Sequence, residues 1–114
     1  MDIDDYQKQI IKFDTFPHPT TDPTDPAFLE KILGLPGEAG EVADKFKKII
    51  RDDSSEITPE NKQEIKKELG DTLWYIATIA HYLDLPLSEI AESNISKLES
   101  RQLRGKLHGS GDNR

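Results

Sequence analysis

Apolar side chains recur at helical spacing in four stretches of the chain, and no stretch alternates apolar and polar residues as a half-buried strand does. The four stretches are residues 3–13, 26–50, 59–83 and 87–101. Each carries apolar residues three or four positions apart, so that they share one face of a helix. The pattern therefore predicts an all-α chain of four helices.

The apolar positions of the last two stretches are expected to face inward. In the third stretch they are Ile65, Leu69, Leu73, Ile76, Ile79, Ala80 and Leu83. In the fourth they are Leu87, Ile90, Ala91, Ile95 and Leu98.

Prolines and cap residues mark the helix boundaries. Residues 14–26 hold four prolines and predict a loop. Asp25 and Thr58 each precede a proline, which is the pattern of a capping residue followed by proline in the first helical turn. Pro36 falls inside the second stretch and should kink that helix or divide it into two. Residues 51–58 are a polar loop, and the glycine-rich residues 105–114 form a polar tail.

Size and charge narrow the functional class. The 114 residues predict one domain, and a formal net charge of -7 argues against binding to a nucleic-acid polymer. The chain has no cysteine, so it has neither a disulfide framework nor a thiolate metal site. It has no apolar run of membrane-spanning length and no signal-peptide pattern, so a cytoplasmic location without a membrane partner is expected.

Two pairs of acidic residues stand out at the margins of the apolar stripes. They are Glu38 with Glu41, in "EAGE", and Glu68 with Asp71, in "ELGD". Residues three apart share a helix face, so each pair projects together. Each pair encloses a glycine, which weakens a helix by about 0.5–1 kcal/mol relative to alanine.

A divalent cation shared between two helices would explain both features. The glycines would let the helix backbones approach, and four carboxylates without thiols favour a hard ion such as Mg²⁺, or Mn²⁺. The alternative is that these acids are solvated surface groups, which are common on the helices of an acidic protein.

Basic residues lie on related faces. Lys45 and Lys48 follow Glu38 and Glu41 by two helical turns, and Asn94, Lys97 and Arg101 form a second stripe. Bases beside a metal-binding surface suit a phosphate ester bridged by Mg²⁺. Alternatively, Lys45 and Lys48 pair with Asp44 and Glu41 on their own helix.

With these residues assembled, the sequence resembles the MazG-like all-α nucleoside triphosphate pyrophosphohydrolases, a group that includes dimeric dUTPases and dCTP pyrophosphatases. The resemblance rests on E-x-x-E followed by E-x-x-D, and it covers most of residues 28–101. The matching segments are "LGLPGEAGEVADKFKK", "KKELGDTLWYIATIA" and "NISKLESR". It implies one MazG-like helical domain over residues 1–104, with residues 105–114 as a tail.

The resemblance also assigns roles to individual residues. The implied Mg²⁺ ligands are Glu38, Glu41, Glu68 and Asp71. The implied substrate-binding residues are Lys45, Lys48, Trp74, Asn94, Lys97 and Arg101. Trp74 could stack on a base, or belong to the core or to a dimer interface. A carboxylate of the cluster, Glu41 first and Glu38 beside it, would orient or deprotonate the attacking water.

The reaction implied is conversion of a ribo- or deoxyribonucleoside triphosphate to the monophosphate and pyrophosphate. The fold implied is a four-helix-type bundle completed by homo-oligomerisation, as a homodimer or homotetramer. A short chain supplies little core by itself, which is consistent with this. Two other classes stay open: a non-catalytic nucleotide- or metal-binding regulatory module, and a helical interaction protein with solvated acids.

Overall fold

The computed structural model describes residues 1–16, 18–52 and 54–114. Its elements are α1 (Ile3–Ile10), the 3-10 helix η1 (Ile11–Phe13), α2 (Pro26–Asp52), α3 (Pro59–Tyr82) and α4 (Leu87–Leu103). Every regular element in the described ranges is helical, which confirms the all-α prediction. Among the same residues, no helix is both long enough and apolar enough to cross a lipid bilayer.

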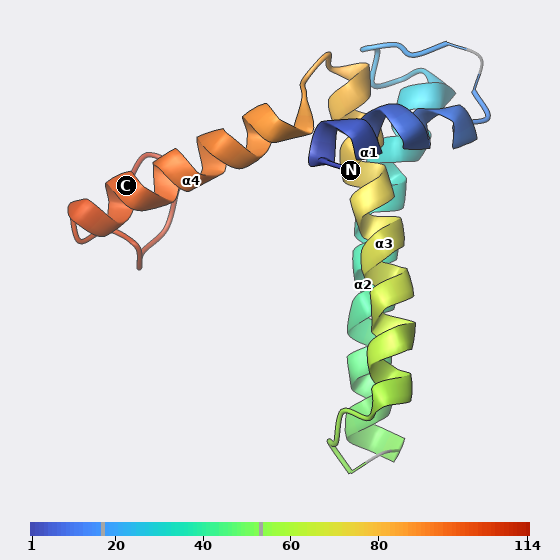
Figure 1. Ribbon diagram of the computed structural model, residues 1–114, viewed down its shortest axis with the longest axis vertical. Coiled ribbons are helices and arrows are strands. Elements are labelled where there is room, and N and C mark those ends of the chain that lie inside the picture. The colour runs from blue at the N-terminus through green and yellow to red at the C-terminus, as the bar shows by residue number, and fades with distance from the viewer. Residues whose placement is uncertain (17, 53) are drawn as a thin grey trace.

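The helices form a hairpin with two attachments. Helices α2 and α3 lie side by side along their length, while α1 crosses the end of this hairpin where α3 meets α4 (Figure 1). Helix α4 then leaves the hairpin at a wide angle and carries the C-terminus away from it (Figure 1).

Capping residues set the helix starts as predicted. The side chain of Thr58 accepts a hydrogen bond from the Asn61 amide at 3.1 Å, and the Asn61 side chain accepts one from the Thr58 amide. Asp25 accepts from the amide of Ala27 at 2.9 Å. These bonds satisfy amides that have no partner within the first helical turn.

Pro36 does not divide the second helix. Helix α2 is continuous from Pro26 to Asp52 with Pro36 inside it. Proline removes one helical hydrogen bond, the one that the carbonyl of Ile32 would accept. Packing of α3 along α2 supplies stabilisation that an isolated helix would lack. Of the two effects predicted for Pro36, a kink or a division of the helix, division is therefore wrong.

The glycine that brings the two helices together is Gly34. A Cβ atom built there would lie 2.1 Å from Cε1 of Tyr75, so the Tyr75 ring packs directly against the α2 backbone. Cβ atoms built at Gly40 and Gly70 would meet nothing within 4 Å. The prediction that these two glycines let α2 and α3 close on each other is therefore wrong within one chain.

Buried apolar side chains gather near the end of the hairpin that α1 crosses. One cluster is Ile10, Ala77, Ala80 and Leu87, and a second is Ala27, Phe28 and Tyr82. The core thus joins α1, the first turns of α2 and α4, and the last turns of α3. The remainder of the hairpin is held mainly by the contact between its own two helices.

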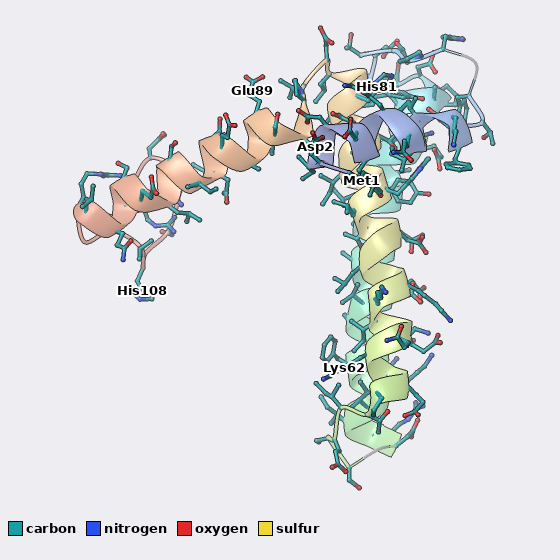
Figure 2. The ribbon with its side chains drawn as sticks, viewed as in Figure 1. Met1, Asp2, Lys62, His81, Glu89 and His108 are labelled. Atoms are coloured by element: carbon teal, nitrogen blue, oxygen red, sulfur yellow. The ribbon has the colours of Figure 1, made fainter. Side chains whose placement is uncertain are left out.

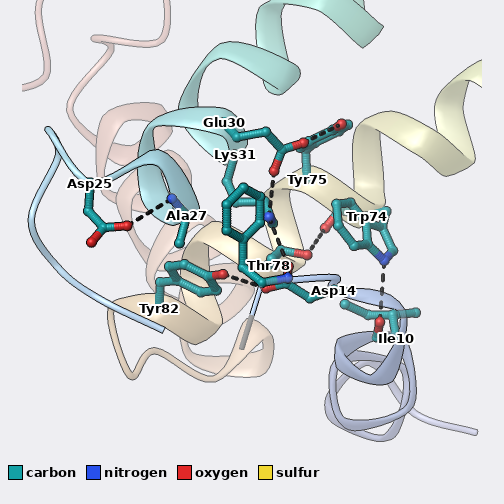
Figure 3. Close-up of polar contacts among 11 residues, drawn as sticks. Ile10, Asp14, Asp25, Ala27, Glu30, Lys31, Trp74, Tyr75, Thr78 and Tyr82 are labelled. Atoms are coloured by element: carbon teal, nitrogen blue, oxygen red, sulfur yellow. Dashed lines mark hydrogen bonds and ion pairs between the residues drawn. The ribbon is translucent and has the colours of Figure 1, made fainter. Parts of the chain in front are cut away.

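A buried ionic network lies beside this core (Figure 3). Lys31 is 1% exposed, and its Nζ lies 3.0 Å from Oδ1 of Asp14 and 2.5 Å from Oε2 of Glu30. The Tyr82 hydroxyl donates to the other oxygen of Asp14, and the Phe16 ring covers Lys31 at 4.6 Å. Burial raises the pKa of Asp14, but the hydrogen bonds from Tyr82 and Lys31 outweigh it and hold the pKa below its usual range. The charged network fixes the start of the loop before α2 against α2 and α3.

Many apolar side chains predicted to face inward are exposed in the single chain. On α3 they are Leu69, Leu73 and Ile76, with Leu83 directly after its end, and on α4 they are Ile90, Ile95 and Leu98. Figure 2 shows the side chains of α4 standing out along the arm from near Glu89 towards the tail that carries His108. The inward prediction for α4 is wrong beyond its first turn, because α1 is its main helical neighbour and meets only the hairpin end of the arm.

The open shape leaves a large surface exposed. The Cα radius of gyration is 17.0 Å, whereas a compact chain of this length has about 13 Å. The accessible surface is 8006 Å², compared with about 6,300 Å² for a compact monomer of the same mass. One chain therefore forms helices and a local core, but not a closed bundle.

Because Tyr75 packs on Gly34, alanine should change the stability of the protein differently at Gly34 and at Gly37. Gly34→Ala should destabilise the protein by about 1–3 kcal/mol, because the added methyl group must displace the Tyr75 ring. Gly37→Ala should be neutral or stabilising by up to about 1 kcal/mol, because it meets no atom of the chain and strengthens the helix. Urea unfolding of both variants measures the difference. Equal stability of the two would contradict the close packing of Tyr75 on Gly34.

Candidate metal centre

The pairing of α2 with α3 brings together acids that are far apart in the sequence. Glu38 projects from α2, and Glu68 and Asp71 project from α3 one helical turn apart. One carboxylate oxygen of each can be chosen so that all three atoms lie within 4.8 Å of one another. Glu41, the fourth predicted ligand, is exposed on the next turn of α2 and lies outside this group of three.

The electrostatics of the group are unfavourable without a cation. Burial raises the pKa of Glu38, and the negative charges of Asp71, Glu68 and Glu41 raise it further. Lys45 lies 3.4 Å from Oε1 of Glu68. Among the described residues, Glu38 and Asp71 have no salt bridge. The cluster therefore keeps an excess of negative charge at neutral pH.

These residues fit a hard divalent cation. Mg²⁺ binds oxygen ligands at about 2.0–2.1 Å, which requires ligand oxygens about 3–4 Å apart. The three carboxylate oxygens lie within 4.8 Å of one another, and rotation of the glutamate side chains would adjust them to this spacing. Carboxylates without sulfur or imidazole are the ligands of Mg²⁺ or Mn²⁺. The residues present are therefore suited to such an ion.

The two lysines on α2 differ in their partners. Lys45 reaches across to α3, where it also lies 3.9 Å from Oε2 of Glu64. Lys48 pairs with Asp44 on its own helix at 2.7 Å, and this hydrogen bond raises the pKa of Lys48. Pairing within the helix, the alternative considered for both lysines, is thus observed for Lys48 with Asp44, and Lys45 instead belongs to the carboxylate group.

The predicted polar stripe on α4 lies on a different part of the molecule from the carboxylates (Figure 1). Asn94 and Lys97 are exposed and line one shallow hollow on α4. Arg101 is 4% exposed because the C-terminal tail covers it. Its Nη2 donates to the backbone oxygen of Asp112 at 2.9 Å, and Lys97 lies 3.5 Å from the Asp112 carboxylate. Within one chain, the α4 bases hold a carboxylate of the tail and do not join the acidic group.

The aromatic residues after the acid motif have separate surroundings. Trp74 packs against the core and donates from Nε1 to the carbonyl of Ile10 at 3.3 Å. Tyr75 lies one turn after Asp71, and its pKa is raised by burial, by Glu30, and also by Glu38 and Asp71. The negative charges of Glu38 and Asp71 therefore act on Tyr75, whereas Trp74 has a core position.

With the geometry described, comparison with known proteins decides the family. Residues 28–104 match the model of the MazG nucleotide pyrophosphohydrolase domain. The chain belongs to the MazG family. It is also 52% identical over 82 residues to the Gene 37 protein of Mycobacterium phage L5, an alignment that covers 72% of each protein. No solved structure matches the chain.

The MazG domain contains every residue predicted for the site. The match begins inside α2, two residues after its start, and ends just beyond α4. Helix α1 and the loop before α2 lie outside the match, although they pack against it. The family match thus covers the carboxylate group and the α4 stripe together.

Two important groups were not predicted from the sequence. Lys31 was not predicted to be buried, although it lies three and four residues after Phe28 and Ala27 and so shares their buried face. Gln7, on α1, is 8% exposed and forms hydrogen bonds to residues far along the chain. Its position three residues before the buried Ile10 was the available signal.

The carboxylate group predicts a response to divalent ions. Mg²⁺ or Mn²⁺ should raise the melting temperature, because an ion that binds only the folded protein stabilises it by about 2.7 kcal/mol at one hundred times its Kd. Glu38→Gln and Asp71→Asn should abolish the rise, and Glu60→Gln, at an exposed position on α3, should retain it. An undiminished rise in Glu38→Gln would contradict the site.

The raised pKa of Glu38 adds a pH signature to the same experiment. When the pKa of a carboxyl group is higher in the folded than in the unfolded state, the folded protein loses stability as the pH rises through the folded pKa. Without ions, Glu38→Gln should therefore melt above the wild type at neutral pH. The difference should disappear on acidification, when Glu38 is protonated in both the folded and unfolded states.

Proposed function

We propose that the protein is a Mg²⁺-dependent nucleoside triphosphate pyrophosphohydrolase, which converts ribo- or deoxyribonucleoside triphosphates to monophosphates and pyrophosphate. The observation that carries the proposal is the meeting of Glu38 with Glu68 and Asp71 across two helices of a MazG domain. Mn²⁺ would serve as an alternative ion. The bound ion would neutralise phosphate charge and orient the triphosphate.

In the proposed reaction, a water oxygen bonds to a phosphorus of the α–β anhydride. The bridging P–O bond breaks, and the bridging oxygen leaves with the electron pair on one of the two products. Glu41 accepts the proton of the attacking water, because it lies one helical turn from Glu38, is exposed, and acts electrostatically on Glu38. Glu38 helps to place that water. All four carboxylates are present, which favours an enzyme over a binding module without turnover.

The basic residues would stabilise negative charge on the phosphates. Lys45 already lies at the carboxylate group through Glu68. Lys48 would have to leave Asp44, and Lys97 and Arg101 would have to exchange Asp112 for phosphate. Asn94, on the same hollow as Lys97, supplies an amide for sugar or phosphate oxygens.

We further propose that two chains complete the bundle. Each chain exposes about 1,700 Å² more than a compact monomer of its mass would, and a stable interface removes roughly 800 Å² from each partner. The exposed apolar residues of α2, α3 and α4 supply that surface. Within one chain, α4 extends away from the carboxylates. A second chain would bring its own α4 towards them.

This arrangement predicts an oligomer. Sedimentation at micromolar concentration should give at least twice the chain mass of 12.9 kDa. Leu69→Asp, at an exposed apolar position of α3, should yield monomers, because a charge in an apolar interface lacks solvation. Ile57→Asp, at an exposed apolar position between α2 and α3, is the matched control and should leave the oligomer intact. A wild-type mass of one chain would contradict the arrangement.

The activity is tested by pyrophosphate release from a panel of nucleoside triphosphates, with Mg²⁺ and with EDTA. Release is expected only with Mg²⁺. Glu41→Gln should lower kcat by about 10²–10⁴-fold, since it removes the proton acceptor, while keeping the ion-dependent rise in melting temperature. Glu60→Gln should retain activity. Near-native turnover of Glu41→Gln would refute its role, and no release by the folded oligomer would favour the non-catalytic binding module.

A further inference from the structure

The start of α4 is capped by side chains of α1. Pro86, the residue directly before α4, provides no side-chain cap. Instead, the amide of Leu87 donates to Oε1 of Gln7 at 3.1 Å. The amide of Ser88 donates to Oδ1 of Asp4 at 2.9 Å, and the Ser88 hydroxyl donates to Oδ2 at 2.6 Å. Two α4 amides that have no partner within their own helix are therefore satisfied from α1.

Gln7 also binds the turn between α3 and α4, residues 83–86. Its Nε2 donates to the carbonyl of Ala77 at 3.2 Å and to the carbonyl of Leu85 at 3.0 Å. One buried amide thus ties together α3, the turn and the first residue of α4. Glutamine is suited to this position because its side chain provides two donor hydrogens and an acceptor.

The turn itself has little freedom once it is held in this way. Asp84 has a φ of 56°, in the left-handed region that non-glycine residues seldom adopt. The amide of Leu85 donates to the carbonyl of Ala80 at 2.8 Å. Leu87 is 3% exposed in the core, whereas Ile90 is 39% exposed. The direction of α4 is therefore set at its first turn.

We propose that Gln7 and Asp4 are positioning residues, which fix the direction of α4 and so deliver Asn94 and Lys97 to the nucleotide. This inference rests on the proposed function. Helix α1 lies outside the matched MazG segment. Through the cap it acts in substrate binding without touching the substrate. A tilt of a few degrees at the first turn displaces Lys97 substantially, since it lies ten residues, or about 15 Å, along the helix.

The direction of α4 can be measured without reference to activity. The chain has no cysteine, so spin labels at Gln63→Cys on α3 and Ser96→Cys on α4 report one chosen distance. Dilution with unlabelled protein removes distances between chains. The unsubstituted labelled protein should give a narrow distance distribution by pulsed electron paramagnetic resonance, and Gln7→Leu should broaden or shift it. Gln9→Leu, at an exposed position of the same helix, is the matched control and should leave it unchanged.

The kinetic consequence is a change in KM more than in kcat. In Gln7→Leu, KM for the nucleotide should rise about tenfold or more, as expected when binding groups are misplaced, while the Mn²⁺-dependent rise in melting temperature persists. Ser88→Ala removes one cap bond only, so it provides a milder variant if Gln7→Leu does not fold. It should show the same changes at smaller size.

An unchanged distance distribution in folded Gln7→Leu, or in Ser88→Ala if Gln7→Leu does not fold, would overturn the proposal. A changed distribution with unchanged KM would overturn the link to substrate. If the unsubstituted protein releases no pyrophosphate, the proposed function fails, and the distance measurement still decides whether α1 sets α4.

Discussion

The close packing of α2 against α3 is the contact on which the rest of the structure depends. Gly34 admits the Tyr75 ring to the α2 backbone. The carboxylate group lies one helical turn after Gly34 on α2 and one to two turns before Tyr75 on α3. A residue with a larger side chain at position 34 would separate the helices where they must be closest. The same contact therefore determines both the stability of the hairpin and the spacing of the acids.

The charged groups on the two sides of this contact differ in whether they have partners of opposite charge. Near α1, Lys31 is buried with Asp14, and each charge has a partner. At the carboxylate group, Glu38 lies among three other acids, and its pKa is raised by burial and by their negative charges. Burial of like charges without full compensation destabilises a fold, and sites that bind ions or substrates are where such an arrangement is retained. The contrast within one pair of helices supports a functional role for the acids.

Helical periodicity and capping residues were sufficient to predict where each helix begins, because both depend on nearby residues. The meeting of Glu38 with Glu68 and Asp71 was also predictable, because both acid pairs lie at the margin of the apolar stripes along which the two helices pack. The direction of α4 was not predictable, since it depends on hydrogen bonds between Gln7 and residues 70 to 80 positions away. The role of Gly34 was missed for a similar reason: no local pattern shows which glycine an aromatic ring from another helix will cover.

In the proposed metal centre, the carboxylates of α2 and α3 bind one kind of ion at one place. Anomalous diffraction from crystals of the protein grown with Mn²⁺ tests this site most directly. We expect a Mn²⁺ peak in contact with Glu38, Glu68 and Asp71, and loss of that peak in Asp71→Asn. A Mn²⁺ peak bound elsewhere, with these three side chains apart and solvated, would contradict it.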